Sequence, residues 1–206
     1  MRGVSMTTIG LTGSIATGKS TIASYLQTKH IPVVDMDLIA REVVEPGTTG
    51  LEMLEKTFGK RIINLDGTLN RGALGDLLFH NDWVREKVNE ILHPFIFELA
   101  DQRVAQYQTQ EEPIIVVDIP ILFEKEGQAQ FDEVWVVYVP EEIQLERLMQ
   151  RNQLKRAEAK VKIESQLSIE EKAQQADVVI DNSKTKEDSY RQVDRELERL
   201  YRAANS

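Results

Sequence analysis

Residues 8–21 read TIGLTGSIATGKST, and this stretch decides the fold. The apolar and β-branched run TIGLT predicts a short strand. The next eight residues, from Gly13 to Ser20, match the pattern G-x-x-x-x-G-K-[ST]. The residues that follow place Ile22 and Leu26 on one face of a predicted helix. A strand, a glycine-rich loop and a helix in this order predict a phosphate-binding loop.

Each residue type in this loop has a physical role. Gly13 and Gly18 permit backbone angles and close approaches that a side chain would block. Successive N–H groups, together with the positive end of a helix that starts near Lys19, form an anion site. The Lys19 ammonium can reach the β- and γ-phosphates, and the Ser20 hydroxyl can ligate Mg²⁺. The loop therefore predicts binding of a nucleoside triphosphate with Mg²⁺, although it does not identify the phosphate acceptor.

The rest of the chain alternates short apolar runs with helical patterns. Four further strands are predicted at residues 31–34, 114–117, 134–139 and 178–180. These runs are continuously apolar and do not alternate with polar residues, as expected for strands covered by helices on both faces. The pattern favours a parallel sheet in an α/β fold.

Two long segments exceed the spacing of a minimal strand–helix–strand unit. Residues 39–107 are helix-rich, and residues 141–175 are polar and helical. We expect both to be lobes at the edge of the sheet where ligands of open α/β folds bind. The chain then forms one domain with an acceptor-binding lobe at 39–107, a lid at 141–175, and a core. The core is predicted to comprise residues 6–38, 108–140 and 176–206, and to end in an amphipathic helix at 186–204.

Composition limits the partners. The net charge of −9 disfavours non-specific binding to nucleic acid. The chain has no cysteine, which excludes disulfides and thiolate metal sites and fits a cytoplasmic location. No apolar run approaches the length of a membrane span, and residues 1–5 do not lead into a signal peptide. We expect small-molecule partners, with no nucleic acid, no membrane and no obligate protein partner.

Two carboxylates follow the second predicted strand. Asp35 and Asp37 are two residues apart, so in an extended segment both side chains would point the same way, towards the γ-phosphate. Transfer of a phosphoryl group to a hydroxyl needs a carboxylate to accept the proton, and a second can serve the Mg²⁺ shell. We favour Asp37 as the base, but the roles could be exchanged, and one aspartate could simply cap the next helix.

Basic residues gather in the predicted lid. Between residues 147 and 162 the single acid is Glu158, and Arg147, Arg151 and Lys155 would share a helical face at i, i+4 and i+8. A basic lid that closes on triphosphate oxygens would neutralise charge and exclude water. We assign this role to Arg147 and Arg151, and expect Lys155 to lie on a solvated surface.

We expect the phosphate acceptor to be a small molecule. A GTPase needs an Asn-Lys-x-Asp segment, which the nearest candidate at 182–185 does not match. A small-molecule kinase fits the length and the two lobes. Nucleotide kinases, shikimate kinases and a non-enzymatic nucleotide switch stay as alternatives.

With these residues in place, the chain resembles the dephospho-CoA kinase family from Ile9 to about Ser183. The motifs that carry the resemblance occur in the family's order. They are GLTG at 10–13, DMDLIAR at 35–41, EPG at 45–47, DGTLNR at 66–71, HP at 93–94, DIPILFE at 118–124 and ADVVIDN at 176–182.

The resemblance implies ATP-dependent phosphorylation of the ribose 3′-hydroxyl of dephospho-CoA, the last step of coenzyme A synthesis. It implies a five-stranded parallel phosphate-loop core of the nucleoside-monophosphate-kinase type, with a helical substrate lobe and a lid. The catalytic residues would be Asp37, Lys19, Asp35 and Arg147, with Ser20 on the metal. The ATP site would comprise Gly13, Ala16, Thr17, Gly18, Lys19, Ser20, Thr21, Arg147 and Arg151. The acceptor site would comprise Asp37, Arg41, Arg71, His93 and Asp118, although His93-Pro94 could equally be a helix-breaking turn.

The chain departs from the family pattern at two positions. Ala16 stands where the family usually has glycine, so we expect this position to avoid a positive φ. Lys162 stands where many members have arginine, which keeps the charge but loses the bidentate geometry.

Overall fold

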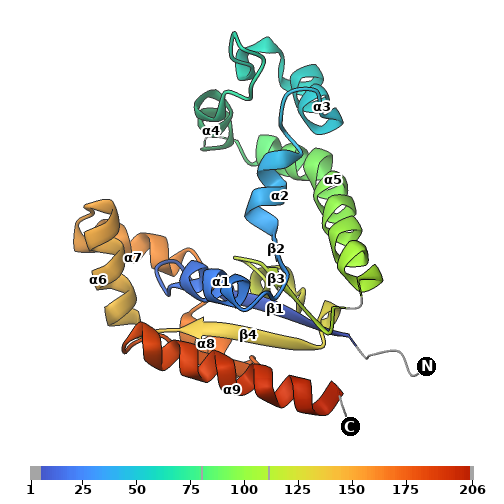
Figure 1. The fold of residues 1–206 in the computed structure, drawn as a ribbon. Coiled ribbons are helices and arrows are strands. Elements are labelled where there is room, and N and C mark those ends of the chain that lie inside the picture. Colours follow the sequence, from blue (N-terminus) through green and yellow to red (C-terminus); the bar gives the residue numbers. More distant parts are fainter. Residues whose placement is uncertain (1–5, 80, 111, 205–206) are drawn as a thin grey trace. The chain divides into compact units, whose positions relative to one another are not determined.

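The computed structural model of the protein describes residues 6–79, 81–110 and 112–204. Residues 1–5, for which no signal peptide is expected, lie outside the described residues. The chain divides into two compact units, one comprising the described residues of 1–35 and 106–206, the other residues 36–105. Figure 1 shows the elements of each unit.

The first unit contains a five-stranded sheet in the order β2-β3-β1-β4-β5. Each neighbouring pair of strands is parallel, which confirms the predicted α/β fold. The strands are β1 (Thr7–Gly13), β2 (Val33–Asp35), β3 (Ile114–Asp118), β4 (Glu133–Tyr138) and β5 (Val178–Asp181). Because β1 is central, its carboxyl end places the phosphate loop in the middle of one sheet edge.

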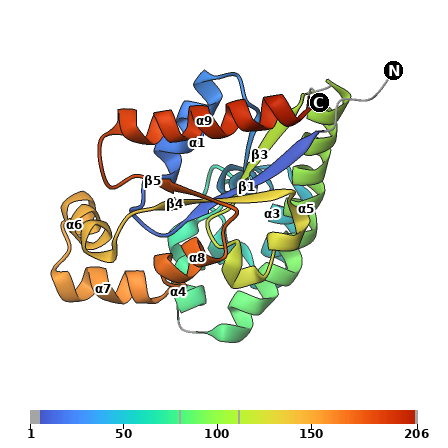
Figure 2. The same ribbon diagram turned by 90° about the horizontal axis from the view of Figure 1, so that it is seen from below.

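Both faces of this sheet are covered by apolar side chains. On one face, Ile9, Leu11 and Trp135 pack against Ile22 of α1 (Lys19–Thr28) and Val193 of α9 (Lys186–Ala204). Figure 2 shows α1 and α9 on the same side of the strands, with α8 (Ile169–Gln174) on the other side. The two-sided cover explains why the strands read as continuous apolar runs in the sequence.

The second face carries a smaller cluster. Val134 and Val136 of β4 pack against Leu122, Phe123 and Ile169. Short 3₁₀ turns, η2 (Phe123–Lys125) and η3 (Gln128–Gln130), lie in the connection between β3 and β4. Alternate residues of β4 therefore serve two different clusters, as the strand period of two requires.

Residues 141–175 of the first unit, the predicted lid, have their own apolar cluster. The segment contains α6 (Glu141–Asn152) and α7 (Arg156–Glu164) as well as α8. Leu145 and Leu148 of α6 pack on Ala159 and Ile163 of α7. Ile15 and Ala16 of the phosphate loop pack against this cluster, so α6 and α7 directly support the loop.

The second unit is helical. It comprises α2 (Met36–Glu42), α3 (Thr49–Phe58), η1 (Lys60–Ile62), α4 (Arg71–Phe79) and most of α5 (Asp82–Thr109). Thr48 caps α3, because its hydroxyl accepts a hydrogen bond from the N–H of Leu51. The structure differs here from one expectation and one alternative. Helix α2 begins directly after β2, where an extended segment was expected, and α5 continues through Pro94, where a helix-breaking turn was the alternative.

No helix in the described ranges combines the length and the apolar composition that a membrane span requires.

Candidate active site

The phosphate loop joins β1 to α1. Gly18 precedes the helix with φ 91°, a left-handed conformation that favours glycine. A Cβ on Gly18 would lie 2.1 Å from Asn182 Nδ2, and a Cβ on Gly13 would lie 2.6 Å from Thr17 Oγ1. The structure thus gives Gly13 and Gly18 the close approaches that the sequence pattern predicts for them.

The loop presents its N–H groups to a ligand. Within the part of the chain that the structure describes, the N–H groups of Ala16, Gly18, Lys19 and Ser20 have no hydrogen-bond acceptor. The last two belong to the first turn of α1, where the helix dipole also favours negative charge. This arrangement is an anion site of the kind that binds phosphate.

The expectation for Ala16 was wrong. Ala16 adopts φ 64°, so the loop keeps the left-handed turn that a glycine would take. This conformation costs an L-residue about 1–2 kcal/mol. The contact of the Ala16 side chain with the apolar cluster of α6 and α7 offsets part of this cost.

Three charged side chains meet at the carboxyl edge of the sheet. The Lys19 ammonium forms an ion pair with Asp118, the last residue of β3. Asp118 is a register partner of Asp35, the last residue of β2. Parallel strands that end together therefore bring two carboxylates and the loop lysine to one place, although the three residues are far apart in the sequence.

Asp37 has a different environment from Asp35. The prediction that the segment is extended was wrong, because α2 starts at Met36 and Asp37 lies in its first turn. The two side chains therefore do not follow the period of two that a strand imposes. A carboxylate in the first turn of a helix is favoured by the helix dipole. Asp35 belongs to the unit that carries the loop, and Asp37 to the helical unit.

The residues predicted for the lid have different surroundings in the structure. Arg147 lies on α6 and donates from Nη2 to the Asn182 carbonyl at 2.8 Å. Arg151 is exposed in the last turn of α6 and donates from Nε to Asn152 Oδ1 at 2.8 Å. The predicted i+8 position was wrong, because α6 ends at Asn152 and Lys155 is the N-cap of α7. Lys155 is exposed, as expected for a solvated lysine.

The predicted acceptor residues of the helical unit lie on three helices. Arg41 is exposed on α2, and Arg71 is exposed at the start of α4. His93 is half-buried on α5 and packs edge-on against Phe97, with ring centroids 5.8 Å apart. The alternative of a helix-breaking turn at Pro94 was wrong, since α5 accommodates the proline in its interior. The missing N–H of Pro94 removes one backbone hydrogen bond there.

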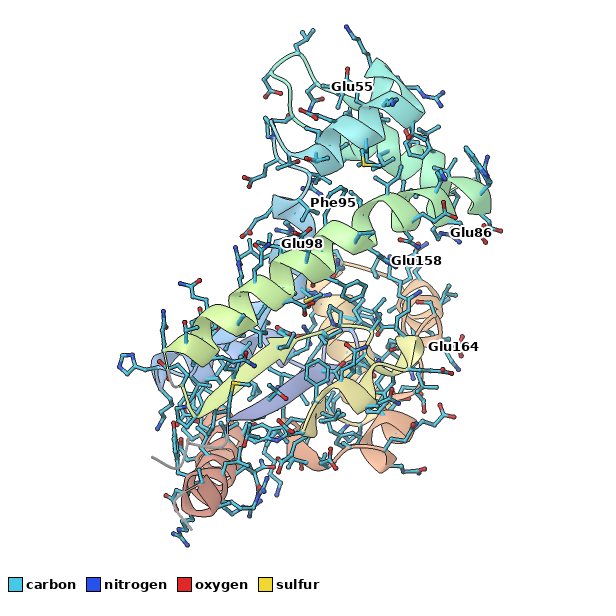
Figure 3. All side chains as sticks on the ribbon, turned by 90° about the vertical axis from the view of Figure 1, so that its right-hand side faces the viewer. Glu55, Glu86, Phe95, Glu98, Glu158 and Glu164 are labelled. Carbon is cyan, nitrogen blue, oxygen red and sulfur yellow. The ribbon has the colours of Figure 1, made fainter. Side chains whose placement is uncertain are left out.

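The helical unit contains a cavity of about 270 Å³. Phe95 and Glu98 of α5, both labelled in Figure 3, contribute to its wall together with Thr48 at the start of α3. The remaining lining residues are Glu42, Val43, Thr49, Gly50, Leu99 and Gln102. Arg41, Arg71 and His93 are not among them, so the cavity and the predicted acceptor residues are separate features of this unit.

The residues present fit a magnesium ion only in combination with a nucleotide. Ser20 is exposed in the first turn of α1, where its hydroxyl is available to a ligand. Among the described residues, no cluster of three or more acidic or histidine side chains could hold a metal by itself. A Mg²⁺ ion that arrives with phosphate oxygens needs only one or two protein ligands.

Sequence reasoning missed three buried polar side chains behind the loop. They are Gln144, Lys172 and Asn182, and each donates a hydrogen bond to a loop carbonyl. A lysine in a polar stretch gives no sign that it is fully buried. The motif ADVVIDN contains Asn182, but the pattern does not indicate that its side-chain amide donates to the loop backbone.

Comparison with known proteins decides the family. The model of the dephospho-CoA kinase family matches residues 7–188. The chain belongs to this family. A dephospho-CoA kinase from Listeria monocytogenes is 46% identical over 193 residues, which cover 94% of this chain and 96% of the relative. A dephospho-CoA kinase from Oceanobacillus iheyensis is 44% identical over 191 residues, or 93% and 96% of the two chains.

Solved structures agree with the dephospho-CoA kinase family. A crystal structure from Thermus thermophilus has a TM-score of 0.81 at 30% identity and covers 95% of this chain and 98% of its own. A dephospho-CoA kinase from Campylobacter jejuni has a TM-score of 0.74 at 26% identity with the same coverages. The resemblance that the motifs carried, and the phosphate-loop kinase fold, are therefore confirmed.

Proposed function

We propose that this chain transfers the γ-phosphoryl group of ATP to the ribose 3′-hydroxyl of dephospho-CoA. The hydroxyl oxygen forms a bond to the γ-phosphorus, the bond between that phosphorus and the ADP oxygen breaks, and the hydroxyl proton leaves. The products are coenzyme A, ADP and a proton. Membership of the dephospho-CoA kinase family supports the reaction, and the phosphate loop with its unused N–H groups is the observation that carries it.

The donor side consists of the loop and α1. The N–H groups of Ala16, Gly18, Lys19 and Ser20 would surround the phosphates of ATP, with Gly13, Thr17 and Thr21 completing the site. Thr17 is buried and donates from Oγ1 to the Ser14 carbonyl at 2.9 Å, so its role is to shape the loop. A preformed set of donors costs little reorganisation when charge moves onto the leaving ADP.

Lys19 would exchange partners when ATP binds. Its ammonium pairs with Asp118 in the structure, and both side chains are largely buried. Phosphate oxygens carry more negative charge than one carboxylate, so they compete effectively for the ammonium. After this exchange, Asp118 would contact the acceptor, as the resemblance implies.

The two aspartates would divide the proton and metal chemistry. Asp37 starts the helical unit, so it would accompany the acceptor and accept the proton of its hydroxyl. Asp35 is held beside Asp118 by the strand register, so it would serve the donor side. Mg²⁺, with Ser20 and Asp35 as its protein ligands, would neutralise charge on the β- and γ-phosphates.

Arg147 and Arg151 would act from the lid. Arg147 already reaches the segment after β5, through its hydrogen bond to the Asn182 carbonyl. From there it could pair with phosphate oxygens in the loop, whereas the exposed Arg151 would reach them after a movement of its side chain. In the helical unit, Arg41, Arg71 and His93 would bind the phosphate and base groups of dephospho-CoA.

An acceptor panel tests the proposal. Purified protein is mixed with ATP, Mg²⁺ and, separately, dephospho-CoA, nucleoside monophosphates and shikimate, and ADP release is recorded. We expect turnover with dephospho-CoA alone, and a product in which phosphorus NMR places the new phosphate on the 3′-oxygen. Turnover of a nucleoside monophosphate or shikimate with none of dephospho-CoA would refute the proposal.

We also place the reaction in the cytoplasm, with small molecules as the only partners. The acidic net charge and the absence of cysteine support this proposal. Full activity of the purified chain without added protein, nucleic acid or lipid would support it, whereas a requirement for any of them would contradict it.

A further inference from the structure

The carbonyl groups of the phosphate loop are held from behind by buried side chains. Lys172 Nζ donates to the Gly13 carbonyl at 3.2 Å, Gln144 Nε2 donates to the Ile15 carbonyl at 2.6 Å, and Asn182 Nδ2 donates to the Thr17 carbonyl at 2.8 Å. Lys172 and Gln144 are fully buried, and Asn182 is 6% exposed. The three donors come from α8, α6 and the segment after β5.

The three carbonyls are those of alternate residues, and this spacing has a consequence. In a planar trans peptide the C=O of one residue and the N–H of the next point in opposite directions. Holding the carbonyls of residues 13, 15 and 17 on the protein side therefore turns the N–H groups of Ser14, Ala16 and Gly18 to the other side. Within the described residues, the N–H groups of Ala16 and Gly18 have no acceptor, whereas Ser14 directly follows Gly13, which pairs with Val137 in the sheet.

The intervening N–H groups behave differently. The N–H of Ile15 donates to Gln166 Oε1 at 2.8 Å, and the N–H of Thr17 donates to the Ser14 carbonyl at 3.2 Å. The backbone thus alternates between groups that the protein uses and groups that it leaves for a ligand. This alternation is what a series of phosphate oxygens requires.

The lysine is itself held in place. Lys172 Nζ forms an ion pair with Glu124 Oε1 at 2.7 Å, and the same oxygen accepts the N–H of Leu167 at 3.1 Å. Glu124 is the last residue of the DIPILFE motif. No structural or catalytic role was assigned to it from the sequence. A fully buried ammonium is costly unless it is paired, so the ion pair with Glu124 holds the Lys172 side chain in its position behind the loop.

From these contacts we infer that Gln144, Lys172 and Asn182 are positioning residues that orient the loop N–H groups towards the phosphates of ATP. The inference rests on the proposed function, because it assumes that the loop binds ATP. It assigns no catalytic contact to the three side chains, which act through the backbone alone. It also gives Glu124 a role, as the residue that orients Lys172.

Gln144→Met is the most direct test. The other amide atom of Gln144, Oε1, is buried without a hydrogen-bond partner among the described residues, so methionine removes an unsatisfied group as well as the donor. We therefore expect an unchanged or slightly higher melting temperature. We expect the dissociation constants of ATP and of tripolyphosphate to rise roughly three- to tenfold, the effect of one hydrogen bond. The KM of dephospho-CoA should stay constant. Gln150→Met, on the exposed part of the same helix, is the matched control.

Lys172→Met provides an independent test. We expect weaker ATP binding and a lower melting temperature, because Glu124 loses its partner. The double variant Glu124→Gln/Lys172→Met should regain stability without regaining ATP affinity, whereas a purely structural role predicts that both recover together. Lys160→Met is the control, since Lys160 is exposed on α7 and pairs with Glu164 on its own helix.

The results separate the possible errors. If the parent protein does not bind ATP, the proposed function fails. If the parent binds ATP and Gln144→Met binds it within twofold of the parent, the positioning inference fails, whatever Lys172→Met does. An equal rise in the KM of both substrates would also overturn the inference, because it would indicate general disruption.

Discussion

Replacing Gly18 by alanine tests the geometry of the phosphate loop most directly. The new Cβ would lie 2.1 Å from Asn182 Nδ2, far inside van der Waals contact, and the residue would keep φ 91°. Asn182 cannot retreat freely, because its Nδ2 donates to the Thr17 carbonyl at 2.8 Å and its Oδ1 accepts the Ser189 hydroxyl at 2.9 Å.

The cost follows from these contacts. The left-handed conformation costs an alanine about 1–2 kcal/mol, and the loss of the two Asn182 hydrogen bonds costs about 1 kcal/mol each. The lower entropy of the unfolded alanine chain returns about 0.4–1 kcal/mol. We therefore expect Gly18→Ala to lower the free energy of unfolding by about 3 kcal/mol. For a chain of this size the melting temperature should fall by about 10 °C.

Thermal unfolding followed by circular dichroism measures this effect, and two glycines separate its components. Gly47 has φ 87°, and apart from its chain neighbours no described residue has a heavy atom within 4 Å of the position that an alanine Cβ would take, so Gly47→Ala should cost only about 1 kcal/mol. Gly75 lies in α4 with open space around it, so Gly75→Ala should stabilise the protein by about 0.5–1 kcal/mol. A Gly18→Ala protein as stable as Gly47→Ala would refute the placement of Asn182 against the loop.

Three further substitutions test the site and the sheet. Lys19→Ala should abolish turnover in the coupled ADP assay, because the β- and γ-phosphates lose their ammonium partner; a near-normal rate would contradict the loop assignment. Asp37→Asn should reduce kcat by about 10²–10⁴-fold with little change in ATP affinity, and the same loss in Asp35→Asn alone would exchange the two roles. Glu133→Gln tests pH dependence: burial raises the pKa of Glu133, but hydrogen bonds from Arg199 and Trp135 outweigh it and lower the pKa below its usual value. Because the pKa of Glu133 is lower in the folded than in the unfolded protein, its ionised form stabilises the fold. This stabilisation is complete above the unfolded pKa of about 4.5 and is lost as the pH falls through the folded pKa. Urea titrations should therefore show Glu133→Gln less stable by about 1 kcal/mol at pH 7 and equal to the parent near pH 3; a constant difference would argue against the ionised pair.

Local sequence patterns were sufficient to predict some elements of the fold. The loop pattern and the apolar runs correctly placed β1, the start of α1 and the parallel sheet, because glycine spacing and strand hydrophobicity are local properties. The terminal helix at 186–204 was also found, since its apolar positions recur at helical spacing.

The wrong predictions share one cause, because in each case tertiary packing outweighs a local conformational preference. Ala16 adopts the positive φ that its residue type disfavours, because the loop has to follow the same turn and its side chain packs on α6 and α7. Asp37 lies in a helix and Pro94 stays inside one, because packing of the helical unit outweighs the local preferences of these residues.

The sequence alone determined the five strands, the phosphate loop and the family, since each depends on residues close together along the chain. Only the tertiary structure decided what stands behind the loop, where Gln144, Lys172 and Asn182 converge on backbone carbonyls from three separate elements. A hydrogen bond between residues more than a hundred positions apart leaves no periodic signal in the sequence. It exists because parallel strands end at one edge of the sheet and bring their following segments together.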